Sequence, residues 1–101
     1  MICKSDMFFE TIGNRTRLKI LELLFDKPMC VNDICKSLHE EQSKISHNLK
    51  KLSGCNFVDV KKKGKNRVYS LNKKTIVPLM RLVEKHVNVY CEECRRKWKF
   101  I

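Results

Sequence analysis

Cysteine is the residue type in this sequence with the widest range of chemistry, and six of the 101 residues are cysteines. Thiolates hold thiophilic ions such as zinc, cadmium or arsenite, and two neighbouring thiols form reversible disulfides. Cys91 and Cys94 have the C-x-x-C spacing of such a pair. Cys30 stands at the predicted start of a helix, where a thiol is more reactive. These three residues are candidate metal or redox residues, and a purely structural role is the alternative.

Basic side chains form the second chemical feature. Lys and Arg total 22 against 11 Asp and Glu, which gives a net charge of +11. Residues 36–74 hold eleven basic and three acidic side chains, so +8 of that charge lies in one segment. Charge of this size and localisation favours double-stranded DNA as a partner over a solvated basic surface without a ligand.

Several classes of protein are excluded or disfavoured by what the sequence lacks. It has no Ser-His-Asp arrangement, paired carboxylate site or Gly-rich phosphate loop, so we expect no enzyme. No apolar run reaches the ~18 residues of a membrane span, and the first ten residues do not form a signal peptide. We therefore expect a cytoplasmic protein with no disulfide framework. Cys3 is expected on an N-terminal arm, and Cys35 and Cys55 in the core.

The elements that must position these residues follow from hydrophobic periodicity. With 101 residues we expect a single domain, 1–101. Apolar residues at helical spacing, followed by a β-branched pattern around a Gly-containing turn, predict a mainly α fold with a small β-hairpin. The expected helices span about 8–12, 14–26, 31–38, 42–52 and 73–98, and the hairpin about 57–71. Two helices joined by three polar residues and followed by a basic hairpin have the order of a winged helix-turn-helix, α-α-α-α-β-β-α.

The helix at 42–52 is the predicted recognition helix. Ile45, Leu49 and Leu52 form its inward face. Its outward positions, which we expect to contact DNA, are Gln42, Ser43, Lys44, Ser46, His47 and Lys50. The expected wing contacts to phosphate or minor groove are Lys61, Lys62, Lys63, Lys65 and Arg67.

The last helix has an apolar seam with the 4, 3, 4, 3 spacing of heptads. A helix this long on so small a domain predicts a partner helix, and a two-fold homodimer is the commonest arrangement. The expected interface residues are Phe8, Phe9, Ile76, Met80, Val83, Val87 and Tyr90.

The segments GNRTRLKILELL, VNDICKSL, QSKISHNLKKL and GKNRVYSLN follow one another with the spacing of a known family. The chain resembles the ArsR/SmtB winged-helix transcriptional repressors from about Phe8 to its end. Arg17 stands where that family has its usual Arg, and Tyr69 and Leu71 match the end of the wing. The resemblance implies a homodimer joined through its first and last helices, which binds an inverted repeat and is released by an inducer.

Three departures from the family pattern concern candidate sites. Glu41 replaces the Ser that often caps the recognition helix, which brings negative charge close to DNA. Residues 30–34 read C-V-N-D-I where metal-sensing members have C-V-C-D-L, so a second thiol is missing. The family's zinc site on the last helix is not expected here either, because Pro78 and Met80 stand where that site has its ligands near the start of the helix.

These features predict a sequence-specific DNA-binding regulator, a homodimeric repressor released by a metal, metalloid or redox signal. The alternatives are an architectural protein that binds DNA without sequence preference, a thiol- or metal-handling protein whose charge is incidental, and a winged-helix protein-interaction module.

Overall fold

The computed structural model describes residues 2–91, with side chains from Ser5 onward. The chain divides after Leu71 into two compact units. The first unit contains α1 (Ile2–Ile12), α2 (Arg15–Asp26), β1 (Met29–Cys30), α3 (Val31–Leu38), α4 (Gln42–Gly54), β2 (Val58–Lys63) and β3 (Asn66–Leu71). The second contains α5 (Ile76–Tyr90). The predicted fold class, mainly helical with a small antiparallel hairpin, is confirmed.

The first two helices meet at a tight turn. Gly13 closes α1 through a 2.8 Å bond from its backbone N–H to the carbonyl of Phe9. A Cβ at Gly13 would lie 2.9 Å from that oxygen, so only glycine fits there without a shift. Asn14 then caps α2, and its side chain accepts a bond from the N–H of Arg17. α1 begins at Ile2, which corrects the prediction of a helix starting near residue 8 and of an N-terminal arm that holds Cys3.

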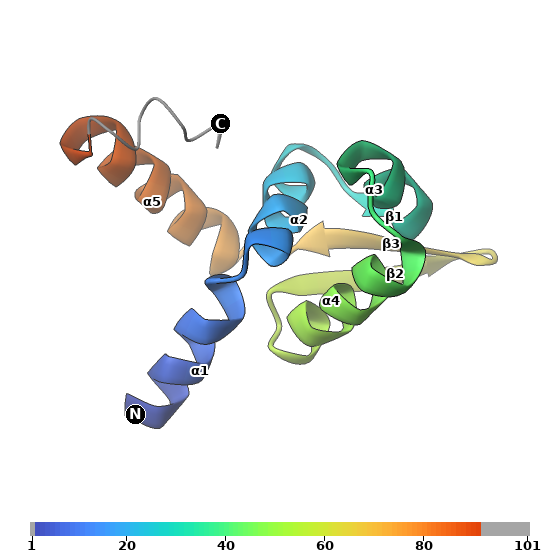
Figure 1. Ribbon diagram of the computed structural model, residues 1–101, viewed down its shortest axis with the longest axis horizontal. Helices are drawn as coiled ribbons and strands as arrows, with labels where there is room; N and C mark the ends of the chain where they lie inside the picture. Colours follow the sequence, from blue (N-terminus) through green and yellow to red (C-terminus); the bar gives the residue numbers. More distant parts are fainter. Residues whose placement is uncertain (1, 92–101) are drawn as a thin grey trace. The chain divides into compact units, whose positions relative to one another are not determined.

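The sheet has one strand more than the sequence predicted. β1 is only two residues long and pairs with β3, opposite Val68 and Tyr69, which gives the antiparallel order β1-β3-β2. Periodicity cannot reveal so short a strand, because two residues carry no alternation. β2 and β3 meet at the two-residue turn Gly64-Lys65, where Gly64 has φ 62. In Figure 1 this ribbon projects beyond α3 and α4 to its turn.

Apolar side chains from α2, α3, α4 and the sheet form the core of the first unit. Its fully buried large side chains are Ile20, Leu21, Ile34, Ile45, Leu49, Leu52 and Phe57. Phe8 of α1 stacks on Phe57, with ring centroids 5.0 Å apart. The predicted inward face of α4 therefore lies in this core. The helix runs two residues past its predicted end, to Gly54.

α5 begins three residues after its predicted start because Asn72 forms a local turn. The side-chain oxygen of Asn72 accepts bonds from the N–H of Lys74 and of Thr75, at 3.0 and 3.4 Å. Pro78 lies in the first turn, where its missing N–H leaves no helical bond unmade. The predicted continuation to residue 98 lies outside the described residues. Among the described helices, none is long and apolar enough to cross a membrane.

The caps of α2 and α4 give a matched test of local stability. Asn14 makes a side-chain cap bond, whereas Glu41, at the same position of α4, makes none. We expect Asn14→Ala to lower the free energy of unfolding by about 1 kcal/mol. We expect Glu41→Ala to change it by less than about 0.5 kcal/mol. Urea denaturation followed by circular dichroism measures both, and equal losses would contradict the assignment.

Candidate nucleic-acid interface

The turn between α3 and α4 has the predicted polar residues His39, Glu40 and Glu41. His39 takes the left-handed conformation, with φ 55 and ψ 46. The backbone N–H groups of His39 and Glu40 both bond to the carbonyl of Cys35, which closes α3 without a glycine. This turn sets α4 off from α3 and leaves one side of α4 in solvent.

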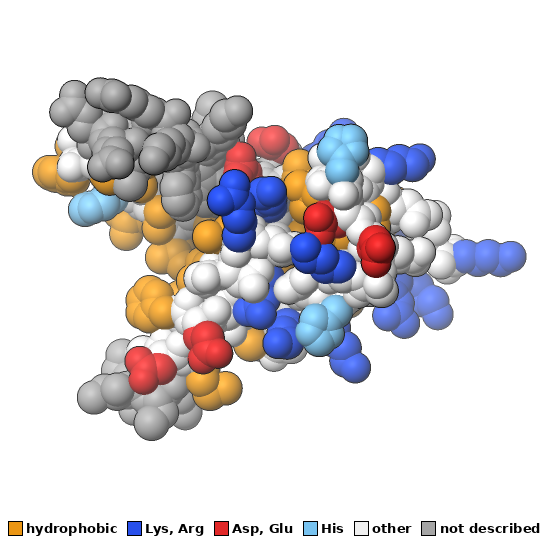
Figure 2. All heavy atoms as spheres, in the orientation of Figure 1, with side chains coloured by type: hydrophobic (Ala, Val, Ile, Leu, Met, Phe, Trp, Pro, Cys, Tyr) orange, Lys and Arg blue, Asp and Glu red, His pale blue; other side chains and the backbone are white. Residues whose placement is uncertain are grey.

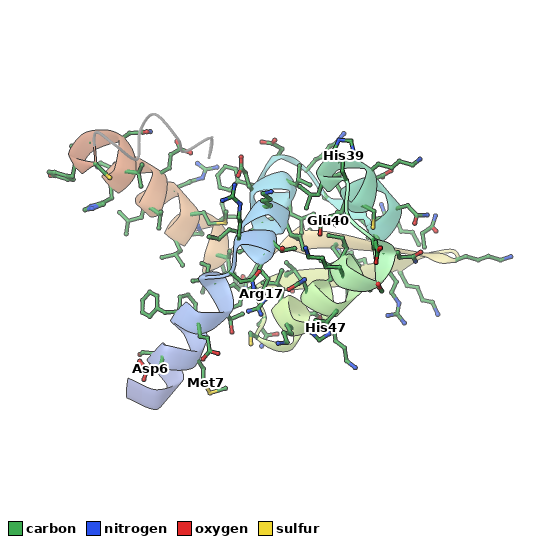
Figure 3. All side chains as sticks on the ribbon, viewed as in Figure 1. Asp6, Met7, Arg17, His39, Glu40 and His47 are labelled. Atoms are coloured by element: carbon green, nitrogen blue, oxygen red, sulfur yellow. The ribbon has the colours of Figure 1, made fainter. Side chains whose placement is uncertain are left out.

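The outward face of α4 matches the prediction in exposure. All six predicted side chains are exposed: Gln42, Ser43, Lys44, Ser46, His47 and Lys50. Figure 3 shows His47 pointing away from the unit. Amide, hydroxyl, imidazole and ammonium groups on one helical face supply the donors and acceptors that read base edges in a major groove.

The hairpin adds a second basic surface. All five predicted wing cations are exposed: Lys61, Lys62, Lys63, Lys65 and Arg67. In β2 only Val58 is buried, so the strand leaves the core after its first residue. On the face drawn in Figure 2, Lys and Arg side chains gather over α4 and toward the hairpin turn. The wing is thus a solvated basic ribbon beside the outward face of α4.

One ion pair lies at the N-terminal end of this surface. The ammonium of Lys44 is 2.5 Å from a carboxylate oxygen of Glu40, four residues earlier. Both side chains are partly exposed, at 52% and 31%. Figure 3 shows Glu40 near the start of α4. The pair was not predicted, although the i, i+4 spacing of opposite charges is visible in the sequence. Lys44 is therefore engaged within the chain.

A polar side chain behind α4 was also missed. Asn48 is 7% exposed and lies among the apolar residues of the inward face. Its side-chain oxygen accepts a 3.1 Å bond from Nε of Arg17. The signal available in the sequence was an amide three residues after Ile45, at a position where the helical pattern calls for an apolar residue.

The cysteines of α3 show contacts but no complete site. Cys30 occupies the predicted N-cap position, yet its side chain makes no cap bond. Its thiol instead donates to a carboxylate oxygen of Asp33 at 3.3 Å. Burial raises the pKa of the Cys35 thiol, a backbone hydrogen bond offsets part of the rise, and the neighbouring Cys30 adds to it. A raised pKa leaves Cys35 protonated and unreactive near neutral pH.

Among the remaining cysteines, Cys55 corrects an expectation. Cys55 is exposed rather than in the core, because α4 ends there and the residue sits at its C-cap. Cys91 is disulfide-bonded at the C-cap of α5; the sequence argued against a disulfide framework but left a reversible disulfide at this residue open. Cys94 lies outside the described residues.

A metal requires more ligands than these contacts supply. Within the described part of the chain, no three His, Cys, Asp or Glu side chains lie close enough together to hold a metal ion. Cys30 and Asp33 form a two-donor contact, and zinc takes four ligands. The predicted metal role of Cys30, Cys91 and Cys94 stays a prediction.

Exposed apolar side chains lie on α1 and α5. They are Met7 and Phe9 on α1, and Leu82, Val89 and Tyr90 on α5, each at least 59% exposed. Of the predicted interface residues, Phe9 and Tyr90 are exposed and Phe8 and Val83 are half-buried. The other three, Ile76, Met80 and Val87, are buried within the chain itself. The predicted place of these three residues in a dimer interface stays a prediction.

The comparisons with known proteins agree with this geometry. Residues 14–60 match the family described as bacterial regulatory protein, arsR family. A transcriptional repressor SmtB homolog from Synechocystis is 29% identical over 79% of this chain, and the chain spans 61% of that protein's length.

Two solved structures have the same fold. The homodimeric winged helix-turn-helix DNA-binding domain Mb0332 from Mycobacterium bovis superposes with a TM-score of 0.79 at 22% identity, covering 86% of this chain and 81% of that one. HlyU from Vibrio cholerae superposes with a TM-score of 0.75 at 24% identity, covering 89% of this chain and 95% of that one.

The fold and the exposed surface define the class as a winged helix-turn-helix. One face of α4, the second helix of the helix-turn-helix, is exposed beside the basic wing. Residues 14–60 match the arsR-family model and the chain is similar to the SmtB homolog, so it resembles the ArsR/SmtB-type transcriptional regulators. The matched family is described as one of bacterial regulatory proteins.

Proposed function

We propose that this chain is a sequence-specific DNA-binding repressor that acts as a homodimer in the cytoplasm, binds an inverted-repeat operator and is released by a redox or metal signal. The observation that carries the proposal is the exposed polar face of α4 beside the basic wing. An architectural protein would need the cations but not a helix with Gln, Ser and His at its outward positions.

Affinity and sequence choice come from different parts of this surface. Lysines that neutralise phosphates release counterions, and the observed binding constant then falls with salt. The wing supplies this term, because its five cations are solvated and carry no sequence information. The outward face of α4 supplies the base contacts, with Gln42 and Lys50 as its longest donors apart from Lys44.

Substitutions in the two regions separate their roles. We expect Lys50→Ala to weaken binding to a selected operator by about 1–3 kcal/mol and binding to random DNA much less. We expect Lys62→Ala to weaken both alike and to lower the salt slope by about one. Selection from random DNA followed by titrations at several salt concentrations measures these effects.

Lys85→Ala, which removes an exposed lysine on α5, is the control. Equal loss on all sequences for Lys50→Ala would favour the architectural protein, and no binding at low salt would end the DNA proposal.

The Glu40–Lys44 pair restrains binding within the proposed interface. DNA must compete with Glu40 for the ammonium of Lys44, and the carboxylate also repels phosphates. We expect Glu40→Gln to tighten binding to DNA of any sequence a few-fold at low salt. An exposed ion pair contributes about 0.2–1 kcal/mol, which corresponds to an effect of this size. The gain should disappear in a Lys44→Ala background.

Glu41→Gln is the matched control for this effect. It removes the same charge from the same turn, but the described contacts include no ion pair between Glu41 and Lys44. A smaller gain for Glu41→Gln than for Glu40→Gln would support competition for Lys44. Equal gains, persisting without Lys44, would show that only net charge matters.

The expected dimer rests on the exposed apolar side chains of α1 and α5, such as Phe9 and Tyr90. Two copies related by a two-fold axis would cover these side chains and present two recognition helices to an inverted repeat. A signal that changes the dimer geometry would then weaken binding to that repeat.

The contacts of the described residues favour a redox signal over a metal. Cys91 is disulfide-bonded, whereas no three-ligand group forms among those residues. In the proposed step, the thiols of Cys91 and Cys94 form a disulfide, and hydrogen peroxide accepts two electrons and two protons to give two waters.

Operator affinity of the reduced protein, measured with and without peroxide, zinc, cadmium or arsenite, tests this proposal. We expect peroxide to weaken binding in the wild type and not in Cys91→Ser. Cys55→Ser, which removes an exposed free thiol, should respond like the wild type. Unchanged affinity under every treatment would leave the cysteines structural.

A further inference from the structure

A buried amide on the recognition helix is the starting observation. Asn48 is the one polar side chain that the protein buries among its described residues. Its neighbours on the inward face, Ile45, Leu49 and Leu52, are fully buried and apolar. A buried amide costs stability unless its hydrogen bonds are made, so a polar residue at this position needs a specific partner.

Both ends of the Asn48 amide have partners. Its oxygen accepts a 3.1 Å bond from Nε of Arg17, and its nitrogen donates a 2.9 Å bond to the carbonyl of Lys44, one turn earlier in α4. The bond from Arg17 is charge-assisted, and the planar guanidinium restricts its direction.

The same guanidinium reaches the end of α1. Nη1 of Arg17 donates a 2.9 Å bond to the backbone carbonyl of Thr11, while the backbone N–H of Arg17 bonds to the Asn14 cap. Figure 3 shows Arg17 where the end of α1, the start of α2 and the side of α4 meet. One side chain of α2 thus bonds to both α1 and α4.

The helix at the other end of this connection carries exposed apolar side chains. Met7 and Phe9 of α1 are both 66% exposed. The tight turn at Gly13 and the stacking of Phe8 on Phe57 hold α1 against the unit. If α1 packs on a second copy, the direction of α4 relative to α1 sets the separation of the two recognition helices.

We infer that Arg17 and Asn48 are positioning residues that set the half-site spacing of the operator by holding α4 relative to α1. This inference rests on the proposed function and adds a specificity element to it. Asn48 is buried and the guanidinium of Arg17 bonds to Asn48 and to Thr11, so their proposed role is indirect. They act because a two-fold dimer binds two half-sites at a separation fixed by its own geometry.

The test compares operators that differ only in the number of base pairs between half-sites. For the wild type we expect a sharp optimum. Arg17→Lys keeps the charge but loses the planar guanidinium with its several N–H donors. For this variant we expect the preference for the optimal spacing, relative to spacings one or two base pairs away, to fall by about tenfold. Asn48→Leu, which keeps the volume and removes the amide, should flatten the profile in the same way.

Ile20→Val is the matched control, because Ile20 is fully buried in α2 and makes none of these bonds. It should weaken binding at every spacing by the same factor, as lost stability alone would do. If Arg17→Lys and Asn48→Leu also weaken binding by the same factor at every half-site spacing, the inference is overturned and the proposed function stays intact. A wild type that binds no operator, or binds every spacing equally, would overturn the proposed function and this inference with it.

Discussion

Burial of one face of α4 is the constraint on which the rest of this structure depends. Ile45, Leu49 and Leu52 enter the core completely, so the opposite face of the helix points into solvent. Burial decides which face of the helix is inward, but hydrophobic burial is non-directional and does not by itself fix the exact rotation of the helix. The directed bonds of Asn48 to Arg17 and to the Lys44 carbonyl add the orientation that packing alone does not supply.

The basic side chains of the solvated surface differ in whether they are already ion-paired within the chain. The wing cations lie on the exposed part of the hairpin, which β2 enters after Val58, so DNA can meet them with little rearrangement. Lys44 is held by Glu40 at the start of the helix, where base contacts are made in this fold. The wing cations therefore supply non-specific electrostatic attraction to DNA. On the helix, the ammonium of Lys44 must exchange Glu40 for a DNA group.

Much of this arrangement was predictable from local pattern. The helix at 31–38, the polar break after it and the exposed face of α4 follow from residue spacing, because a helix of fixed period can bury only one stripe. Features that depend on residues far apart in the chain were missed. β1 exists because Met29 and Cys30 meet β3, some 40 residues later. Cys55 is exposed because the chain turns away from the core where α4 ends.

By itself, the sequence determined the family pattern, the order of elements and the concentration of positive charge between residues 36 and 74, since all three are properties of neighbouring residues. Tertiary structure decided which contacts those residues make. It paired Arg17 with Asn48 across 31 positions, and it buried Ile76, Met80 and Val87 within the chain. The physical reason is that a hydrogen bond needs two groups at a set distance and angle. Only the folded chain brings groups so far apart in sequence to that geometry.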